Sequence, residues 1–234
     1  MLTAGERWRA DFVSQAGQHA DVQVPKVEGL TRDERSALGG SLATFQLGES
    51  GTGEHLIAAA RAAPTDDGYV AALEAFVKEE QEHARLLALV LEGIDHPLLT
   101  SHWSDRAFVF IRRFKSLRTE VLSLLVAELI ALRYYSALRD GIDSRQLAAI
   151  FGRIHADEVR HVDFHADTLP PHILRWHRPV RRMVRVLWNT LVTGTSIVVA
   201  IDHRAALRLV GVGSREFLTD VWRLRSELDQ RLFG

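Results

Sequence analysis

The sequence has no cysteine, little proline and no excess of either charge. Without cysteine it can form no disulfide, thiolate zinc site or iron–sulfur cluster, and it offers no cysteine nucleophile. The 29 Lys and Arg residues nearly balance the 30 Asp and Glu residues, so the overall charge gives no reason to expect binding to nucleic acid or to an anionic membrane. The 31 leucines and 27 alanines among 234 residues, with only 6 prolines, favour an all-helical protein.

No segment of the sequence has the pattern of a signal peptide or of a membrane span. Residues 1–20 carry charged side chains where a signal peptide would have an apolar run. The longest uncharged stretch, residues 186–201, is interrupted by threonine, serine, asparagine and glycine, which makes it too short and too polar to cross a bilayer. These features predict a cytoplasmic protein without a membrane span.

Proline and glycine residues divide the chain into segments with helical periodicity. Thr31 followed by Glu34 is a capping-box sequence at the start of one of them, and no segment shows the alternation of a β-strand. The apolar pattern predicts helices, the sixth broken near Pro179, over residues 3–19, 31–62, 67–92, 104–139, 143–168, 172–210 and 214–231. We therefore expect a single all-α domain over residues 1–234.

Two glutamates lie within the apolar faces of predicted helices. Glu49 belongs to the apolar stripe of the 31–62 helix, and Glu128 belongs to that of the 104–139 helix. A carboxylate in a core is costly unless a positive group lies beside it, and neither stripe contains a Lys or Arg. Both glutamates therefore indicate a cation that the sequence itself does not supply.

The chemistry of the chain is concentrated in a repeated Glu-x-x-His motif. The motif occurs twice, as Glu80 with His83 and as Glu158 with His161. At this spacing both side chains project from one face of a helix. A core glutamate precedes each motif, Glu49 by about 31 residues and Glu128 by about 30, which is the length of one helical hairpin. Two such hairpins packed face to face would bring four glutamates and two histidines together, a set that suits two metal ions with a preference for oxygen ligands.

This double pattern resembles the ferritin-like di-iron carboxylate superfamily over about residues 38–168. The resemblance implies a ferritin-like four-helix bundle at about 31–168, with accessory helices at about 3–19 and 172–231. It also implies two metal ions per chain, either two iron ions or one iron and one manganese. The metal-binding and catalytic residues that it implies are Glu49, Glu80, His83, Glu128, Glu158 and His161.

The resemblance further implies a role for the acidic residue that precedes each Glu-x-x-His motif, here Glu79 and Asp157. In oxygen-activating members this acid accepts a hydrogen bond from the ligand histidine of the opposite hairpin. We therefore expect Asp157 to bond the outer ring nitrogen of His83, and Glu79 to bond that of His161. Solvation, or an ion pair with a neighbouring arginine, is the alternative for both acids.

Three other glutamates have the right chemistry but a less favourable position. We expect Glu54 to lie in a solvated charge pair with Arg61, because the two residues are seven apart on one predicted helix. We expect Glu82 and Glu120 at the surface, where their neighbours are polar or charged.

Four further residues are open to two interpretations. His165, one turn beyond the second motif, is a candidate extra ligand, as in some N-oxygenating di-iron enzymes, or a hydrogen-bonded core histidine. Tyr135, seven residues after the second core glutamate, is a candidate redox-active or gating residue, or a packing aromatic. Asp202 and His203 are candidates for a contact to substrate or to the metal ligands, or a polar pair at a helix end.

Glycines near the first core glutamate also call for an explanation. Gly48, Gly51 and Gly53 flank it, and each costs about 1 kcal/mol relative to alanine inside a helix. Either another helix approaches closely there, or the missing side chains leave a cavity beside the metals. Small residues of the 172–210 helix are candidates to line the same cavity, namely Thr190, Thr193, Gly194, Thr195 and Ser196.

The resemblance implies an enzyme that activates O₂ to hydroxylate, desaturate or N-oxygenate a small organic substrate. A separate electron donor or reductase would be needed, because the chain has no cysteine and no flavin motif. A ferroxidase or other iron-handling protein, a peroxidase and a manganese catalase remain alternatives. The helices that follow the bundle would crowd a ferritin cage, so we expect a smaller assembly, with a homodimer as one option.

A basic segment lies outside the bundle and is most simply a solvated helix face. Docking of an acidic partner such as a reductase, or of nucleic acid, is the alternative. Its arginines are Arg175, Arg178, Arg181, Arg182 and Arg185, with Trp176 and Trp188 interleaved.

Overall fold

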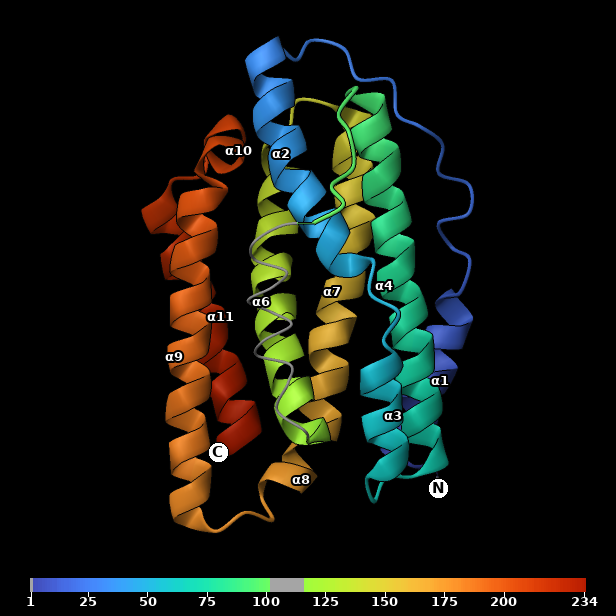
Figure 1. Cartoon of the computed structure of the whole chain (residues 1–234), viewed down its shortest axis with the longest axis vertical. Coiled ribbons are helices and arrows are strands. Elements are labelled where there is room, and N and C mark those ends of the chain that lie inside the picture. Colours follow the sequence, from blue (N-terminus) through green and yellow to red (C-terminus); the bar gives the residue numbers. More distant parts are fainter. Residues whose placement is uncertain (1, 102–115) are drawn as a thin grey trace.

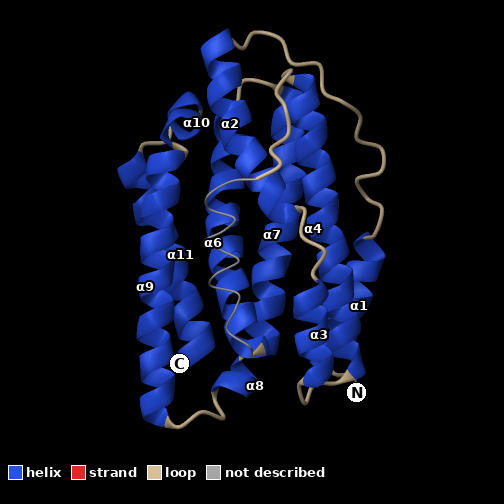
Figure 2. Ribbon diagram, viewed as in Figure 1, coloured by secondary structure: helices blue, strands red, loops and turns tan. Residues whose placement is uncertain are grey.

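The computed structural model describes residues 2–101 and 116–234, and every regular element in these two ranges is a helix (Figure 2). This confirms the all-α prediction. The helices are α1 (Ala4–Gln15), α2 (Arg32–Glu49), α3 (Glu54–Ala62), α4 (Asp67–Gly93), α6 (Leu117–Gly141), α7 (Arg145–Thr168), α8 (Pro170–Ile173), α9 (Arg178–Asp202), α10 (Arg204–Leu209) and α11 (Ser214–Phe233).

Local sequence signals account for where several helices begin. Thr31 and Glu34 form the capping box at the start of α2, since each side chain bonds the backbone N–H of the other residue. Ser116 and Ser144 accept bonds from backbone N–H groups at the starts of α6 and α7. Caps of this kind are worth about 1 kcal/mol each, so they fix helix boundaries that the apolar pattern alone leaves loose.

Two predicted helices are divided in the structure. The 31–62 prediction is wrong as one helix, because the chain breaks after Glu49 and resumes as α3. Gly53 has a φ of 65°, a left-handed conformation that favours glycine, and a side chain there would collide with Val77. The 172–210 segment contains the end of α8, then α9 and α10. The predicted break near Pro179 is confirmed, because α8 ends at Ile173 and Pro179 lies in the first turn of α9, where its missing N–H costs nothing. The second division, at His203 between α9 and α10, was not predicted. The first part of the 104–139 prediction lies outside the described residues.

The four long central helices form two packed pairs. α2 lies against α4, α6 lies against α7, and the pairs meet through α4 and α7 (Figure 1). This is the pair of hairpins that the spacing of the glutamates predicted. α1 covers the α4 side of this bundle, whereas α9 and α11 pack against each other and cover the α6 side (Figure 1). Buried apolar side chains from Phe12 to Phe233 form one continuous core through these elements.

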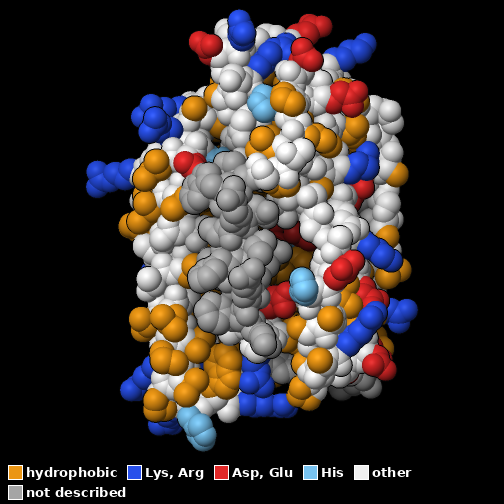
Figure 3. Space-filling model, viewed as in Figure 1, with side chains coloured by type: hydrophobic (Ala, Val, Ile, Leu, Met, Phe, Trp, Pro, Cys, Tyr) orange, Lys and Arg blue, Asp and Glu red, His pale blue; other side chains and the backbone are white. Residues whose placement is uncertain are grey.

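Two helices, α6 and α9, are long and apolar enough to cross a membrane by length and composition alone. α6 is a core helix with most of its apolar stretch buried, whereas the corresponding stretch of α9 is only 22% buried. Figure 3 shows hydrophobic side chains gathered over α9. Met183, Val186 and Leu187 of this helix are exposed. The absence of a membrane span therefore stays a prediction.

Candidate metal centre

The six predicted ligands come from all four bundle helices. Glu49 is the last residue of α2 and Glu128 lies midway along α6. One ligand atom from each of the four motif residues lies within 4.8 Å of the others, in a group that could hold a metal ion. The four residues are Glu80, His83, Glu158 and His161.

The two core glutamates extend this group. Glu128 Oε2 lies 3.4 Å from the Nδ1 atom of His161. Glu49 lines the same cavity as Glu80, Glu128 and Glu158, so all four predicted carboxylates border one space. The structure thus brings the six residues together, and their role as ligands stays a prediction.

The inward-facing atoms fit a cation better than they fit each other. His83 Nδ1, His161 Nδ1 and both carboxylate oxygens of Glu158 are buried and have no hydrogen-bond partner among the residues described. One oxygen of Glu80 and one of Glu128 are in the same condition. Leaving so many polar atoms unpaired in a core is costly, and metal coordination would satisfy all of them at once.

Without metal, protons have to take the place of the missing positive charge. Burial and the neighbouring carboxylates of Glu80 and Glu158 raise the pKa of both Glu49 and Glu128 well above the usual range of a carboxyl group. Burial alone would lower the pKa of His83, but its contacts with Asp157 and Glu158 raise it to about 10. The metal-free centre therefore holds protons that a metal ion would displace.

The pKa of Glu158, the glutamate of the second motif, is shifted in the opposite direction. Burial favours the protonated form of Glu158, but its close contacts with His161 and His83, at 3.8 and 3.4 Å, outweigh burial and lower the pKa of this carboxyl group. Burial likewise lowers the pKa of His161, whereas its four glutamate neighbours raise it well above its usual range. Glu158 is thus the carboxylate around which both protonated imidazoles gather in the metal-free protein.

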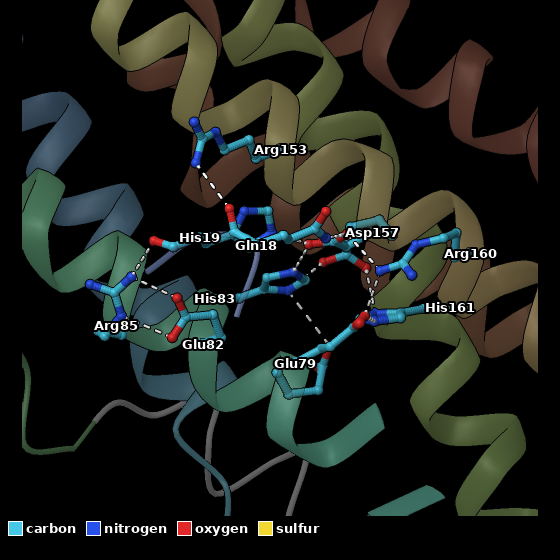
Figure 4. A network of polar contacts seen from close by, with 12 residues as sticks. Gln18, His19, Glu79, Glu82, His83, Arg85, Arg153, Asp157, Arg160 and His161 are labelled. Carbon is cyan, nitrogen blue, oxygen red and sulfur yellow. Dashed lines mark hydrogen bonds and ion pairs between the residues drawn. The ribbon is translucent and has the colours of Figure 1, made fainter. Parts of the chain in front are cut away.

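Each histidine is held from behind by an acid of the opposite hairpin, as predicted. The Nε2 atom of His83 lies 3.2 Å from Asp157 Oδ2, and that of His161 lies 3.0 Å from Glu79 Oε2 (Figure 4). A carboxylate can only accept, so Nε2–H donates in both rings and Nδ1 is turned toward the four glutamates. Such a partner fixes the tautomer and strengthens the imidazole as a ligand.

Arg160 bonds both of these acids as well. Its Nη2 atom lies 2.7 Å from Glu79 Oε2 and 2.7 Å from Asp157 Oδ1 (Figure 4). Its Nη1 atom lies 3.2 Å from Asp11 Oδ2. The pairing with histidine and the alternative pairing with an arginine therefore occur together. Arg160 stands three residues after Asp157 on α7, a spacing that could have indicated the contact.

The chain between α1 and α2 supplies two contacts that the sequence did not indicate. His19 Nε2 lies 2.7 Å from Asp157 Oδ2, and Gln18 Nε2 donates to Asp157 Oδ1 over 3.1 Å (Figure 4). Burial would raise the pKa of Asp157, but His19, His83 and Arg160 together hold it below its usual value. The carboxylate behind His83 is consequently kept ionised.

The rival glutamates lie away from the centre. Glu54 is exposed at the start of α3, and the predicted pair with Arg61 is wrong, because Arg61 bonds Glu74 instead. Both residues lie on α3, but Arg61 reaches Glu74 of the neighbouring α4. Glu82 pairs with Arg85 on the outer side of α4, at 2.6 Å.

Glu120 lies in the first turn of α6, partly exposed and two turns before Glu128. This agrees with the expected position at the surface end of the helix.

His165 is fully buried beside Phe76 and Phe164, and neither ring nitrogen has a hydrogen-bond partner in the described part of the chain. The hydrogen-bonded alternative is therefore wrong. Burial, and then the charge of His161, lower the pKa of His165 to about 3. It is not one of the clustered ligand atoms, and its role as an extra ligand stays a prediction.

Tyr135 lies at the centre itself. Its hydroxyl group donates to Glu49 Oε1 over 3.3 Å, and its ring is fully buried against Phe45 and Tyr134. Tyr135 thus packs as a core aromatic and also contacts a predicted ligand, and its role as a redox-active or gating residue stays a prediction.

A cavity of about 160 Å³ adjoins the four glutamates. Gly48 lines it, which favours the cavity explanation for that glycine, whereas Gly53 serves the backbone turn before α3. Of the small α9 residues that were candidates, Thr195 lines the cavity. Asp202 and His203 stand at the end of α9 and also line the cavity, so their contact to a substrate or to the metal ligands stays a prediction.

Comparison with protein-family models finds no match for this chain, and comparisons with curated proteins and with solved structures find none either. The ligand pattern and its geometry therefore carry the functional inference on their own.

Proposed function

We propose that this chain is a ferritin-like di-iron oxidoreductase, with an Fe/Fe or Fe/Mn pair, that uses O₂ to hydroxylate, desaturate or N-oxygenate a small organic substrate. The observation that supports this most directly is the group of six acidic and imidazole side chains around buried, unpartnered ligand atoms. The adjoining cavity offers room for an organic molecule next to that group. The metal pair would supply the reduction of O₂ and the oxidising power.

The protein would hold, orient and shield this chemistry. His83 and His161 would each bind a metal through Nδ1, because their Nε2 atoms are committed to Asp157 and Glu79. The four glutamates would balance the charge of two divalent ions. Tyr135 holds a proton at Glu49, and the apolar walls of the cavity would exclude water from the substrate.

Electrons would come from outside the chain. With no cysteine, the protein cannot carry an iron–sulfur cluster of its own, so a separate donor or reductase is needed.

Metal stoichiometry tests the proposal at its base. Anaerobic loading with Fe²⁺, followed by elemental analysis, should give two metals per chain in the wild type. Glu128→Ala and Glu49→Ala should each lose one or both, whereas Glu54→Ala, which removes an exposed glutamate of α3, should keep two. At most one tightly bound metal in the wild type would contradict a dinuclear centre.

Exposure of the iron-loaded protein to O₂ separates the proposed oxidoreductase from an iron-handling protein. We expect consumption of O₂ by a small assembly, without growth of an iron mineral, as judged by size-exclusion chromatography and iron-core absorbance. A large shell that accumulates mineral would instead support ferroxidase and storage activity.

A further inference from the structure

The cavity beside the metal centre has an unusual distribution of charge. Aliphatic and aromatic side chains of α2, α6 and α9 form most of its wall, among them Phe45, Ile130 and Val199. Its acidic groups are the four glutamates and Asp202. No Lys or Arg among the described residues lines it.

Asp202 is the acid that the fold does not use. It is the last residue of α9, it is exposed, and it forms no ion pair with any residue in the described ranges. A carboxylate at the C-terminal end of a helix faces the negative end of the helix dipole, so its charge is unfavourable there. Among the described residues this carboxylate is therefore left without an ionic partner, at an electrostatic cost, where the cavity meets the end of α9.

The residue next to Asp202 is tied to the bundle by buried hydrogen bonds. His203 is buried, and its Nδ1 atom lies 2.7 Å from Ser41 Oγ, which in turn lies 2.5 Å from the hydroxyl group of Tyr134. Phe45 stacks on Tyr134 with a ring distance of 4.0 Å. These contacts connect the end of α9, where Asp202 stands, to α2 and α6.

From this arrangement we infer that the cavity binds a small apolar amine, with its ammonium group at Asp202 and its apolar body against the walls beside the metal centre. Two divalent ions would offset the four glutamates, which leaves Asp202 as the uncompensated charge of the cavity. A cationic group would compensate it, whereas an anionic group would meet no described cation. A cavity of about 150 Å³ is known to hold a benzene-sized molecule, so an amine with one ring fits the available volume.

Naming this amine the substrate rests on the proposed function, and placing its ammonium group at Asp202 rests on the two metal ions that would offset the four glutamates. The test compares benzylamine with benzyl alcohol, which has the same ring and shape without the charge. Calorimetric titration of the zinc-loaded protein should give about fivefold tighter binding of benzylamine, the upper range for an ion pair near the surface. Elemental analysis of the same samples reports the metal content, so failure of the metal centre is seen separately.

The variant Asp202→Asn should reduce the preference for benzylamine over benzyl alcohol to about one. Its melting temperature should be unchanged or slightly raised, because an unfavourable charge leaves the helix end. Asp143→Asn is the matched control: it removes an exposed carboxylate that does not line the cavity, and it should keep the fivefold preference. No measurable binding of benzylamine, equal binding of the two probes by the wild type, or a preference that survives in Asp202→Asn would each overturn the inference.

Discussion

Loading the centre with divalent metal should release roughly two to four protons per chain near neutral pH. In the metal-free protein the pKa of His83 is about 10, and that of His161 is well above its usual range, so both imidazoles carry an extra proton at pH 7. A metal can bind Nδ1 of each ring only after that proton leaves, and the two histidines therefore account for the release of two protons. Glu49 and Glu128, whose pKa values are also raised, account for the higher number.

The same protons set the pH dependence of binding and of stability. Each proton displaced per metal makes the apparent affinity rise about tenfold per pH unit, so affinity should increase at least that steeply from pH 6 to 8. The metal-free protein should behave in the opposite way. Folding raises the pKa of His83 and of His161 above the ordinary value of 6.5. The two protonated imidazoles therefore contribute fully to the free energy of unfolding below pH 6.5, and this contribution is lost as the pH rises toward 10.

Calorimetric titration with Mn²⁺ in two buffers of different ionisation enthalpy measures the proton count directly. Glu128→Gln should release fewer protons per chain than the wild type, because it removes one ionisable ligand and weakens metal binding. Fewer than about one proton released at pH 7, or an affinity independent of pH, would refute the reasoning, because the histidines would then already be neutral.

Two further predictions concern residues around the centre and in the bundle. Asp157→Asn should weaken metal binding by about 10–100-fold in a chelator competition assay. Asp11→Asn, which removes only the more exposed partner of Arg160, should change metal binding little. Equal losses in the two variants would contradict the role of Asp157. Gly141→Ala should destabilise the protein by roughly 1–3 kcal/mol in urea unfolding, because the added methyl group meets the backbone carbonyl of Val210. Gly40→Ala, on an open face of α2, should instead stabilise it by up to about 1 kcal/mol, and a gain from both changes would contradict the close contact.

The sequence predicted the convergence at the centre because helical periodicity determines it. Once Glu49 and Glu128 are recognised as core residues, the face of each hairpin that turns inward is known, and the Glu-x-x-His spacing places both motif side chains on that face. The bonds to Asp157 and Glu79 follow from the same geometry, since each acid precedes a ligand by one residue. Local pattern was therefore sufficient for the six side chains and the two acids.

The remaining contacts depend on long-range packing, which a periodic pattern does not encode. His19 belongs to a connecting segment with no regular spacing, yet it reaches across to Asp157, about 140 residues later in the chain. The break after Glu49 depends on the left-handed backbone conformation of Gly53. This position needs a glycine because a side chain there would collide with Val77. In the 172–210 segment the sequence predicted the break near Pro179 but not the second division, at His203 between α9 and α10.

The support behind the two histidines is unequal, and this has a consequence for how the centre fills. Asp157 is 2% exposed and is held by Gln18, His19 and Arg160 in addition to His83. Glu79 is less buried, and besides His161 its one partner among the described residues is Arg160, which also bonds Asp157. We expect the half of the centre around His83 to be the tighter one, so that the first equivalent of metal occupies it alone. A second, different ion could then enter the half around His161, and the order of addition would decide which mixed pair the protein carries.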